Sequence, residues 1–169
     1  MEAHIRRKDR EMPRDFALRV ADNCTFSVMA TVNPDGTPYC IPLSLAREGD
    51  RLYFHCAHQG HKIDNLRYQN QVCIACVGNV KVIPEDFSTE YESAIISGVA
   101  SEVTDRAEKI HALELICRRY TPDNMANFDH AIRKSLDITA IWKIRIDEIS
   151  GKRKKLDKDG KEMKFGRME

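Results

Sequence analysis

The 169-residue chain has almost no excess of charge and no long hydrophobic run. Its 27 basic residues face 26 acidic ones, which leaves a net charge of +1 and gives no electrostatic case for a nucleic-acid-binding protein. No stretch approaches the ~18 apolar residues of a membrane span. Residues 1–15 are charged and lack the apolar core of a secretory signal. We therefore expect a cytoplasmic protein, free of membrane and nucleic acid, with six unpaired cysteines.

The common catalytic motifs are also missing. The chain has no GxGxxG, no GxxxxGK[ST], no GxSxG and no HExxH, so neither a dinucleotide fold, a P-loop, acyl transfer nor zinc hydrolysis is favoured. Cys73 and Cys76 form one CxxC without a second pair, and residues three apart in a strand point to opposite faces. His55, His58 and His61 recur every three residues, but Gly60 interrupts any shared helix. We predict no metal site.

Runs of β-branched and aromatic residues dominate what is present, separated by turn residues such as Asn33-Pro34-Asp35-Gly36. These runs predict six strands, at residues 25–32, 38–45, 51–57, 71–78, 93–103 and 138–149. Helical spacing predicts four helices, at residues 15–21, 61–67, 105–120 and 125–136. For the third helix, Asp105 and Glu108 have the spacing of a capping box.

The order of these elements decides the fold class. Strands follow one another directly as hairpins rather than alternating with crossover helices, which excludes a doubly wound parallel sheet. Gly98 inside its strand indicates a bulge, as a barrel needs at a corner. We therefore predict a mainly β protein, a six-stranded antiparallel barrel with helices at its periphery.

Charge divides the chain into a domain, residues 1–150, and a tail, residues 151–169. The tail holds eight basic and four acidic residues, a net charge of +4, so the rest sums to −3. Without an apolar period, the tail is typical of an extended arm or a disordered end. It is either a basic clamp on a phosphate or partner subunit, or a solvated tail.

Two local features suggest a ligand site. Pro42 removes a hydrogen-bond donor in mid-strand, so that strand belongs at an edge or bulge where a ligand could dock. Gly60-His61-Lys62 at a helix start offers backbone N–H groups and a cation, which suit a phosphate. These features permit a flavin or phosphate-ligand site without singling one out.

A longer segment carries a family resemblance. Residues 53–66, YFHCAHQGHKIDNL, resemble the pyridoxamine 5′-phosphate oxidase-like, flavin-binding split barrels, and within them the 5-nitroimidazole reductase (nitroimidazole-resistance) group. Further agreement, over about residues 5–155, lies in Arg6–Arg10, the hairpin from Asp35 to Leu43, the stretch from Phe87 to Ser93, and Ile149–Lys152.

The resemblance implies a split-barrel homodimer with two FMN molecules at the subunit interface. The implied cofactor-binding residues are Pro42, Leu43, Ser44, His55, Cys56, Ala57, His61, Lys62, Asn65, Trp142 and Lys152. Of these, residues 42–44 would line the flavin ring, residues 55–57 would pass under the ring or ribityl chain, and His61, Lys62 and Asn65 would hold the phosphate. Trp142 and Lys152 would come from the late strand, in one reading from the other subunit, with core packing the alternative for Trp142.

The implied reaction is hydride transfer from NAD(P)H to FMN, followed by reduction of a small aromatic acceptor such as a nitroaromatic. His61 is the implied catalytic residue, which would orient substrate or donate a proton, and Phe87, Thr89 and Glu92 would edge the substrate pocket. The arginine-rich ending of true pyridoxamine phosphate oxidases is absent, so vitamin B6 oxidation is not expected. A non-catalytic flavin- or haem-binding protein and a deazaflavin-dependent reductase remain alternatives.

Overall fold

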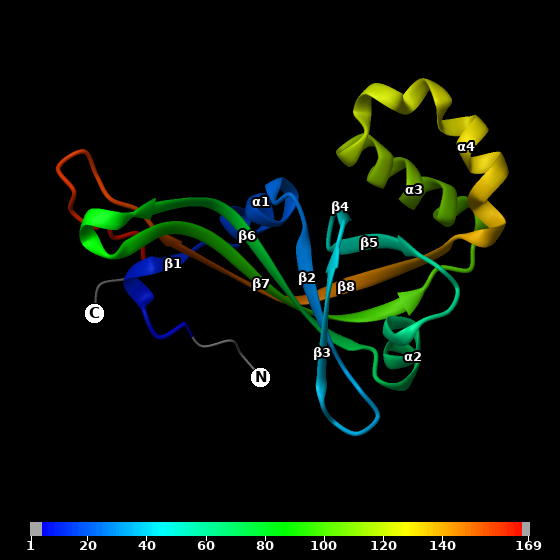
Figure 1. The fold of residues 1–169 in the computed structure, drawn as a ribbon, viewed down its shortest axis with the longest axis horizontal. Helices are drawn as coiled ribbons and strands as arrows, with labels where there is room; N and C mark the ends of the chain where they lie inside the picture. The colour runs from blue at the N-terminus through cyan, green and yellow to red at the C-terminus, as the bar shows by residue number, and fades with distance from the viewer. Residues whose placement is uncertain (1–4, 167–169) are drawn as a thin grey trace.

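The computed structural model describes residues 5–166, in which eight strands build one antiparallel sheet (Figure 1). The strands are β1 (Glu11–Met12), β2 (Ser27–Val32), β3 (Pro38–Leu43), β4 (Ala46–Glu48), β5 (Arg51–Cys56), β6 (Gln71–Ile83), β7 (Ser88–Glu102) and β8 (Ala140–Lys154). The helices are α1 (Arg14–Asn23), α2 (His61–Tyr68), α3 (Arg106–Tyr120) and α4 (Phe128–Ser135). Short 3₁₀ turns are η1 (Lys8–Arg10), η2 (Pro84–Asp86), η3 (Pro122–Asn127) and η4 (Leu136–Ile138).

The strand order is β3-β2-β6-β7-β8-β5-β4, with β1 paired to the far end of β8. The predicted class, an antiparallel β fold with peripheral helices, is confirmed, but the predicted number of six strands is wrong. The two additional strands, β1 and β4, have two and three residues. Segments this short show no alternation that a sequence pattern could reveal.

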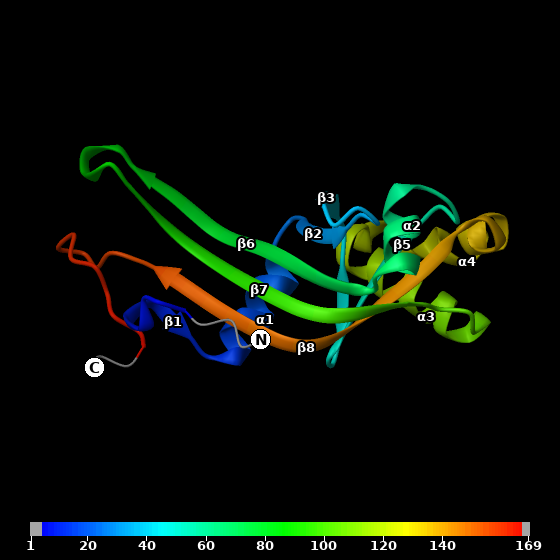
Figure 2. The ribbon, with the colours of Figure 1, turned by 90° about the horizontal axis from the view of Figure 1, so that it is seen from below.

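Three long strands, β6 to β8, form a curved ribbon that runs the length of the molecule (Figure 2). They span 13, 15 and 15 residues and extend beyond the predicted limits. The bulge expected at Gly98 is confirmed, because the register of β7 against β8 shifts between Ser97 and Gly98. A Cβ at Gly98 would collide with the carbonyl oxygen of Arg145, so only glycine fits there.

Hydrophobic side chains form two cores. The larger lies between the sheet, α1 and α2 and contains Phe54, Ile63 and Trp142. The smaller lies between β5, β8 and α3 and contains Tyr53 and Ile141. Neighbouring residues of β5 therefore enter different cores, so this strand is covered on both faces.

The helix signals match the structure at their starts. Pro13 precedes α1, and the Asp105 carboxylate accepts a hydrogen bond from the Glu108 backbone N–H at 2.8 Å, as the capping-box spacing predicted. The helix predicted over residues 125–136 is instead divided into η3, α4 and η4. None of the helices within residues 5–166 is long and apolar enough to cross a membrane.

The C-terminal segment continues the sheet and then folds back. The domain boundary expected at residue 150 falls inside β8, where Gly151 packs closely against Ala17 of α1. Beyond β8, Glu162 accepts two hydrogen bonds from the Arg10 guanidinium, both at 2.7 Å. Arg167 and Glu169, counted in the basic tail, lie outside the described residues.

Candidate cofactor site

The first turn of α2 forms a corner, residues 60–62, whose groups suit an anion. Gly60 precedes the helix with φ +129° and ψ 163°, a conformation essentially restricted to glycine. Its carbonyl accepts hydrogen bonds from the backbone N–H groups of Ile63 and Asp64 at 2.8 and 3.1 Å. The preceding N–H groups, of His61 and Lys62, have no partner inside a helix. Together with the positive end of the helix dipole they favour a bound anion.

The side chain of Lys62 adds a full positive charge at this corner. Its Nζ lies 5.9 Å from the centre of the buried Phe54 ring, at a distance where a cation is attracted to the ring face. Burial, and secondarily the charge of Lys62, lowers the pKa of His55 at the end of β5.

His61 is fixed by the hairpin that joins β2 and β3. Its Nε2 lies 2.7 Å from Oδ1 of Asn33, and its ring stacks on Tyr39 with 4.2 Å between ring centres. The amide nitrogen of Asn33, Nδ2, donates a hydrogen bond to Thr37 Oγ1 at 2.9 Å. Because that contact places the Asn33 oxygen toward His61, Nε2 of His61 is the hydrogen-bond donor.

Asn65 is fully buried one turn further along α2. Its Nδ2 donates to Thr31 Oγ1 at 3.0 Å and to Asn33 Oδ1 at 2.7 Å. Its own Oδ1 is buried without a protein partner within residues 5–166. Asn65 therefore joins α2 to β2 from inside the protein and does not lie on the surface of the corner.

The edge of the sheet next to this corner is β3. Pro42 and Ser44 are exposed, whereas Leu43 is buried. Since β3 pairs only with β2, the expectation that Pro42 lies on an edge strand is confirmed. Pro42 is three residues, about 10 Å along an extended strand, from the Tyr39 that stacks on His61.

Residues 55–57, where β5 ends, lead directly into α2. Tyr53 and His55 share one face of β5, while Phe54 and Cys56 share the other. The side chains of His55 and Cys56 therefore point to opposite faces, and a ligand crossing this strand end contacts one of them together with the backbone.

Trp142 and Lys152, both predicted to bind the cofactor, lie far from each other on β8. Trp142 packs in the larger core, and its Nε1 is buried without an acceptor within residues 5–166. Lys152 is ten residues further along the same strand, about 34 Å at the rise of an antiparallel strand, and pairs with Glu11 of β1. Within one protomer, Lys152 and Lys62 are thus too far apart to hold one phosphate.

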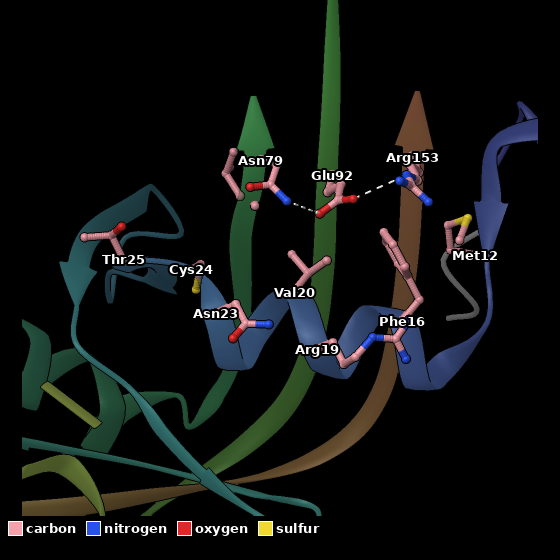
Figure 3. A pocket seen from close by; sticks show the side chains of 12 residues that line it. Met12, Phe16, Arg19, Val20, Asn23, Cys24, Thr25, Asn79, Glu92 and Arg153 are labelled. Atoms are coloured by element: carbon pink, nitrogen blue, oxygen red, sulfur yellow. Dashed lines mark hydrogen bonds and ion pairs between the residues drawn. The ribbon is translucent and has the colours of Figure 1, made fainter. Parts of the chain in front are cut away.

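Sequence reasoning missed a pocket of about 440 Å³ between α1 and the strands β6 to β8 (Figure 3). Arg19, Cys24 and Thr25 line it from the α1 side. Glu92 lines it from β7, where its carboxylate accepts a hydrogen bond from Asn79 at 3.0 Å and pairs with Arg153 at 3.3 Å. Glu92, expected near a substrate pocket, is in this wall; Phe87 is fully exposed at the β6–β7 turn.

A second missed feature is the support of the β3–β4 link by α3. The carbonyl oxygen of Leu45 accepts hydrogen bonds from Arg119 Nη1 at 2.6 Å and from the Tyr120 hydroxyl at 3.0 Å. These contacts join residues 74 and 75 positions apart, which no local pattern encodes.

The spacings of the cysteines and histidines that could suggest a metal site can be checked in the structure. Cys73 is exposed and Cys76 buried, on opposite faces of β6, as residues three apart in a strand must be. Residues 5–166 contain no group of three His, Cys, Asp or Glu side chains placed to hold a metal ion.

Comparison with known proteins decides the family. A family model described as pyridoxamine 5′-phosphate oxidase matches residues 13–153. The chain belongs to this family. The resemblance inferred from the sequence is confirmed, and with it the split-barrel fold.

Solved structures agree with this assignment. The chain is 29% identical to a proposed 5-nitroimidazole antibiotic resistance protein from Bacteroides thetaiotaomicron, over 85% of this chain and 86% of that one, with a TM-score of 0.72. An FAD and haem binding protein from Mycobacterium smegmatis is 23% identical over 86% and 73% of the two chains, TM-score 0.71. An F420 reductase is 19% identical over 82% and 98%, TM-score 0.55. The last two show the fold alone. No curated protein matches.

The residues at the start of α2 fit a flavin phosphate. Unpaired N–H groups, a lysine and a glycine converge there, and a Cβ built on Gly60 would meet nothing within 4 Å, so the space above the corner is open. A phosphate dianion matches this set of donors in charge and in hydrogen bonding.

Proposed function

We propose that this protein is an FMN-dependent oxidoreductase that works in the cytoplasm as a homodimer, takes electrons from NAD(P)H and passes them to a small aromatic acceptor such as a nitroaromatic. The observation that carries the proposal is the phosphate corner of Gly60, His61 and Lys62 beside the edge strand β3. A flavin family and a relative described by nitroimidazole resistance support it.

Each part of the site has a proposed task. Lys62 and the first N–H groups of α2 bind the phosphate, and residues 42–44 of the β3 edge contact the ring. Bound FMN supplies the hydride and electron-transfer chemistry, so the chain itself needs no acid–base triad. Asn33 orients His61, whose imidazole is the proposed group for orienting the acceptor or moving a proton to it.

The outer face of the sheet supports the proposed dimer. One apolar row crosses four neighbouring strands: Pro42 of β3 lies opposite Val28 of β2, which lies opposite Ala75 of β6, which lies opposite Ile95 of β7. Val77, on the same face of β6 as Ala75, is 55% exposed. A contiguous exposed apolar surface of this kind is typical of a protein interface. Lys152 would then reach the cofactor site from β8 of the partner, whereas Trp142 is buried in the core of its own protomer.

The deciding experiment is anaerobic reduction of the protein purified with its native ligand. The proposal predicts a yellow protein whose flavin absorption is bleached by NADH or NADPH and returns when a nitroaromatic or a quinone is added. A flavin that neither nucleotide bleaches contradicts the reductase and favours a binding protein. A Soret band indicates haem instead, and reduction only by a reduced deazaflavin indicates the third alternative.

A further inference from the structure

Two thiols share one hydroxyl group at the wall of the α1 pocket. Cys24 follows the last residue of α1, and its Sγ lies 3.3 Å from the Ser27 hydroxyl. The Sγ of Cys76 on β6 lies 3.3 Å from the same hydroxyl. Ser27 and Cys76 are directly opposite each other in the β2–β6 ladder. The three side chains are buried, Cys76 and Ser27 at 1% exposure and Cys24 at 4%.

The guanidinium of Arg119 reaches this cluster from α3. It donates to three backbone carbonyls, those of Ala21, Leu45 and Cys24, at 2.6 to 2.9 Å, and its Nη2 is 3.8 Å from Cys24 Sγ. Within residues 5–166 it forms no ion pair with a carboxylate. A half-buried cation without a carboxylate partner favours an anion beside it, and the thiolate of Cys24, 3.8 Å away, can supply one.

We propose that Cys24 and Cys76 are a redox-active dithiol pair, in which Cys24 is the nucleophile toward a hydroperoxide and Cys76 the resolving thiol. The pair is independent of the flavin site. Its disulfide would attach the C-terminal end of α1 to β6 across one wall of the pocket.

The pKa shifts of the two thiols agree with Cys24 as the nucleophile and Cys76 as the resolving thiol. The hydrogen bond from Cys76, with those from Ser27 and Arg119, lowers the pKa of Cys24. The hydrogen bond to Cys24 and burial raise the pKa of Cys76, which stays protonated. Access comes from the pocket, because Cys24 is one of its lining residues (Figure 3).

The chemistry balances with hydrogen peroxide as the oxidant. The Cys24 thiolate attacks one peroxide oxygen, so that an S–O bond forms, the O–O bond breaks and hydroxide leaves to become water. Cys76 then attacks the sulfur of the Cys24 sulfenic acid. The S–S bond forms, the S–O bond breaks, and the proton of Cys76 leaves with the second water. Two thiols lose two electrons and one peroxide gains them.

Peptide mass spectrometry tests the pair. Cys24 and Cys40 share a tryptic peptide, as do Cys73 and Cys76, so the full chain is used as the double variant Cys40→Ser/Cys73→Ser, which removes two exposed thiols. After treatment with hydrogen peroxide, the proposal predicts a Cys24–Cys76 linked peptide that a reductant separates. In the added Cys76→Ser variant, a 1,3-dione reagent should label Cys24 as the sulfenic acid.

The pH profile of alkylation supplies a second, variant-free readout. In the untreated chain, the midpoint for modification of Cys24 by iodoacetamide should lie below that of the exposed Cys73, whatever the absolute rates. A Cys24 midpoint at or above that of Cys73 would overturn the proposal. Peroxide oxidation that leaves Cys24 and Cys76 as thiols, or that links neither to the other, would overturn it as well.

Discussion

Oδ1 of Asn33 accepts the hydrogen of His61 Nε2 at 2.7 Å, which fixes both the tautomer and the direction of this imidazole. The same oxygen accepts a hydrogen bond from the buried Asn65 at 2.7 Å. One amide of the β2–β3 hairpin therefore holds the start of α2 and the proposed catalytic histidine at once. Because Nε2 is occupied, and Nδ1 of His61 has no hydrogen-bond partner within residues 5–166, Nδ1 is the ring nitrogen left for the proposed ligand.

Replacing Asn33 tests this arrangement. Asn33→Ala leaves the buried Nδ2 of Asn65 with one partner fewer, so we expect the free energy of unfolding to fall by about 1–3 kcal/mol. Nitrogen NMR of His61 should change from a single Nε2–H tautomer to a mixture. The control is Asn127→Ala, at an exposed residue whose side chain bonds, within residues 5–166, only to Asn124. It should change stability by less than about 0.5 kcal/mol. An unaltered His61 spectrum would refute the role of Asn33.

The conformation of Gly60 gives a second prediction. At φ +129° any other residue is strained, at a cost of about 1–3 kcal/mol. Gly60→Ala should therefore weaken both folding and FMN binding, because the first turn of α2 carries the phosphate donors. Gly49→Ala, at φ +56° in the β4–β5 turn, is the matched control and should lower the unfolding free energy only. Equal FMN affinities of the two variants would count against the corner as the phosphate site.

The proposed dimer is tested at Val77. A lysine there would be buried without a partner when two copies meet, which costs several kcal/mol, so Val77→Lys should raise the dimer dissociation constant at least about 100-fold. Light scattering coupled to gel filtration measures it. Ile138→Lys, at an apolar residue of η4 that is even more exposed than Val77, should leave the dimer intact. A Val77→Lys protein that remains dimeric would place the interface elsewhere.

Acid should release the C-terminal segment from η1. Hydrogen bonds from Arg10, followed by those from Lys164, lower the pKa of Glu162 to about 2. An unfolded glutamate has a pKa of about 4.3, and the folded value lies below it. The contribution of Glu162 is therefore complete above about pH 4.3 and lost as pH falls toward 2. The thermal midpoint of Glu162→Gln should depend less on pH in this window than that of the parent protein. Identical slopes would contradict the contact.

The sequence predicted those elements whose cause is local. Pro42 belongs on an edge strand because it lacks an N–H group, and Gly98 marks a bulge because no side chain fits there; both are confirmed. The pairing of Glu11 with Lys152 and the support of Leu45 by Arg119 join distant parts of the chain. Single-sequence patterns do not contain such contacts, so the pairing of β1 and the α1 pocket were missed, whereas β4 is too short to show an alternation.

In the candidate site, too, the residues adjacent in sequence could be predicted, and the contacts between distant segments could not. Gly60, His61 and Lys62 are adjacent in sequence, and a glycine before a helix already indicates their arrangement. The roles of Asn33 and of Cys24 with Cys76 depend on hairpin and ladder register, which only the folded chain reveals. Lys152 illustrates the converse: its place on β8 is too far from Lys62 within one chain, so its predicted role depends on the proposed dimer.

The most direct measurement compares FMN with riboflavin, which differ only in the phosphate, in the parent protein and in Lys62→Ala. A charge-assisted hydrogen bond is worth about 1.5–3 kcal/mol, roughly a 10- to 100-fold change in affinity. Isothermal titration should show a strong preference of the parent for FMN, reduced by this factor in Lys62→Ala but not in the control Lys81→Ala, while riboflavin binds all three alike. Equal affinity of the parent for both ligands, or a preference that survives Lys62→Ala, would contradict the account.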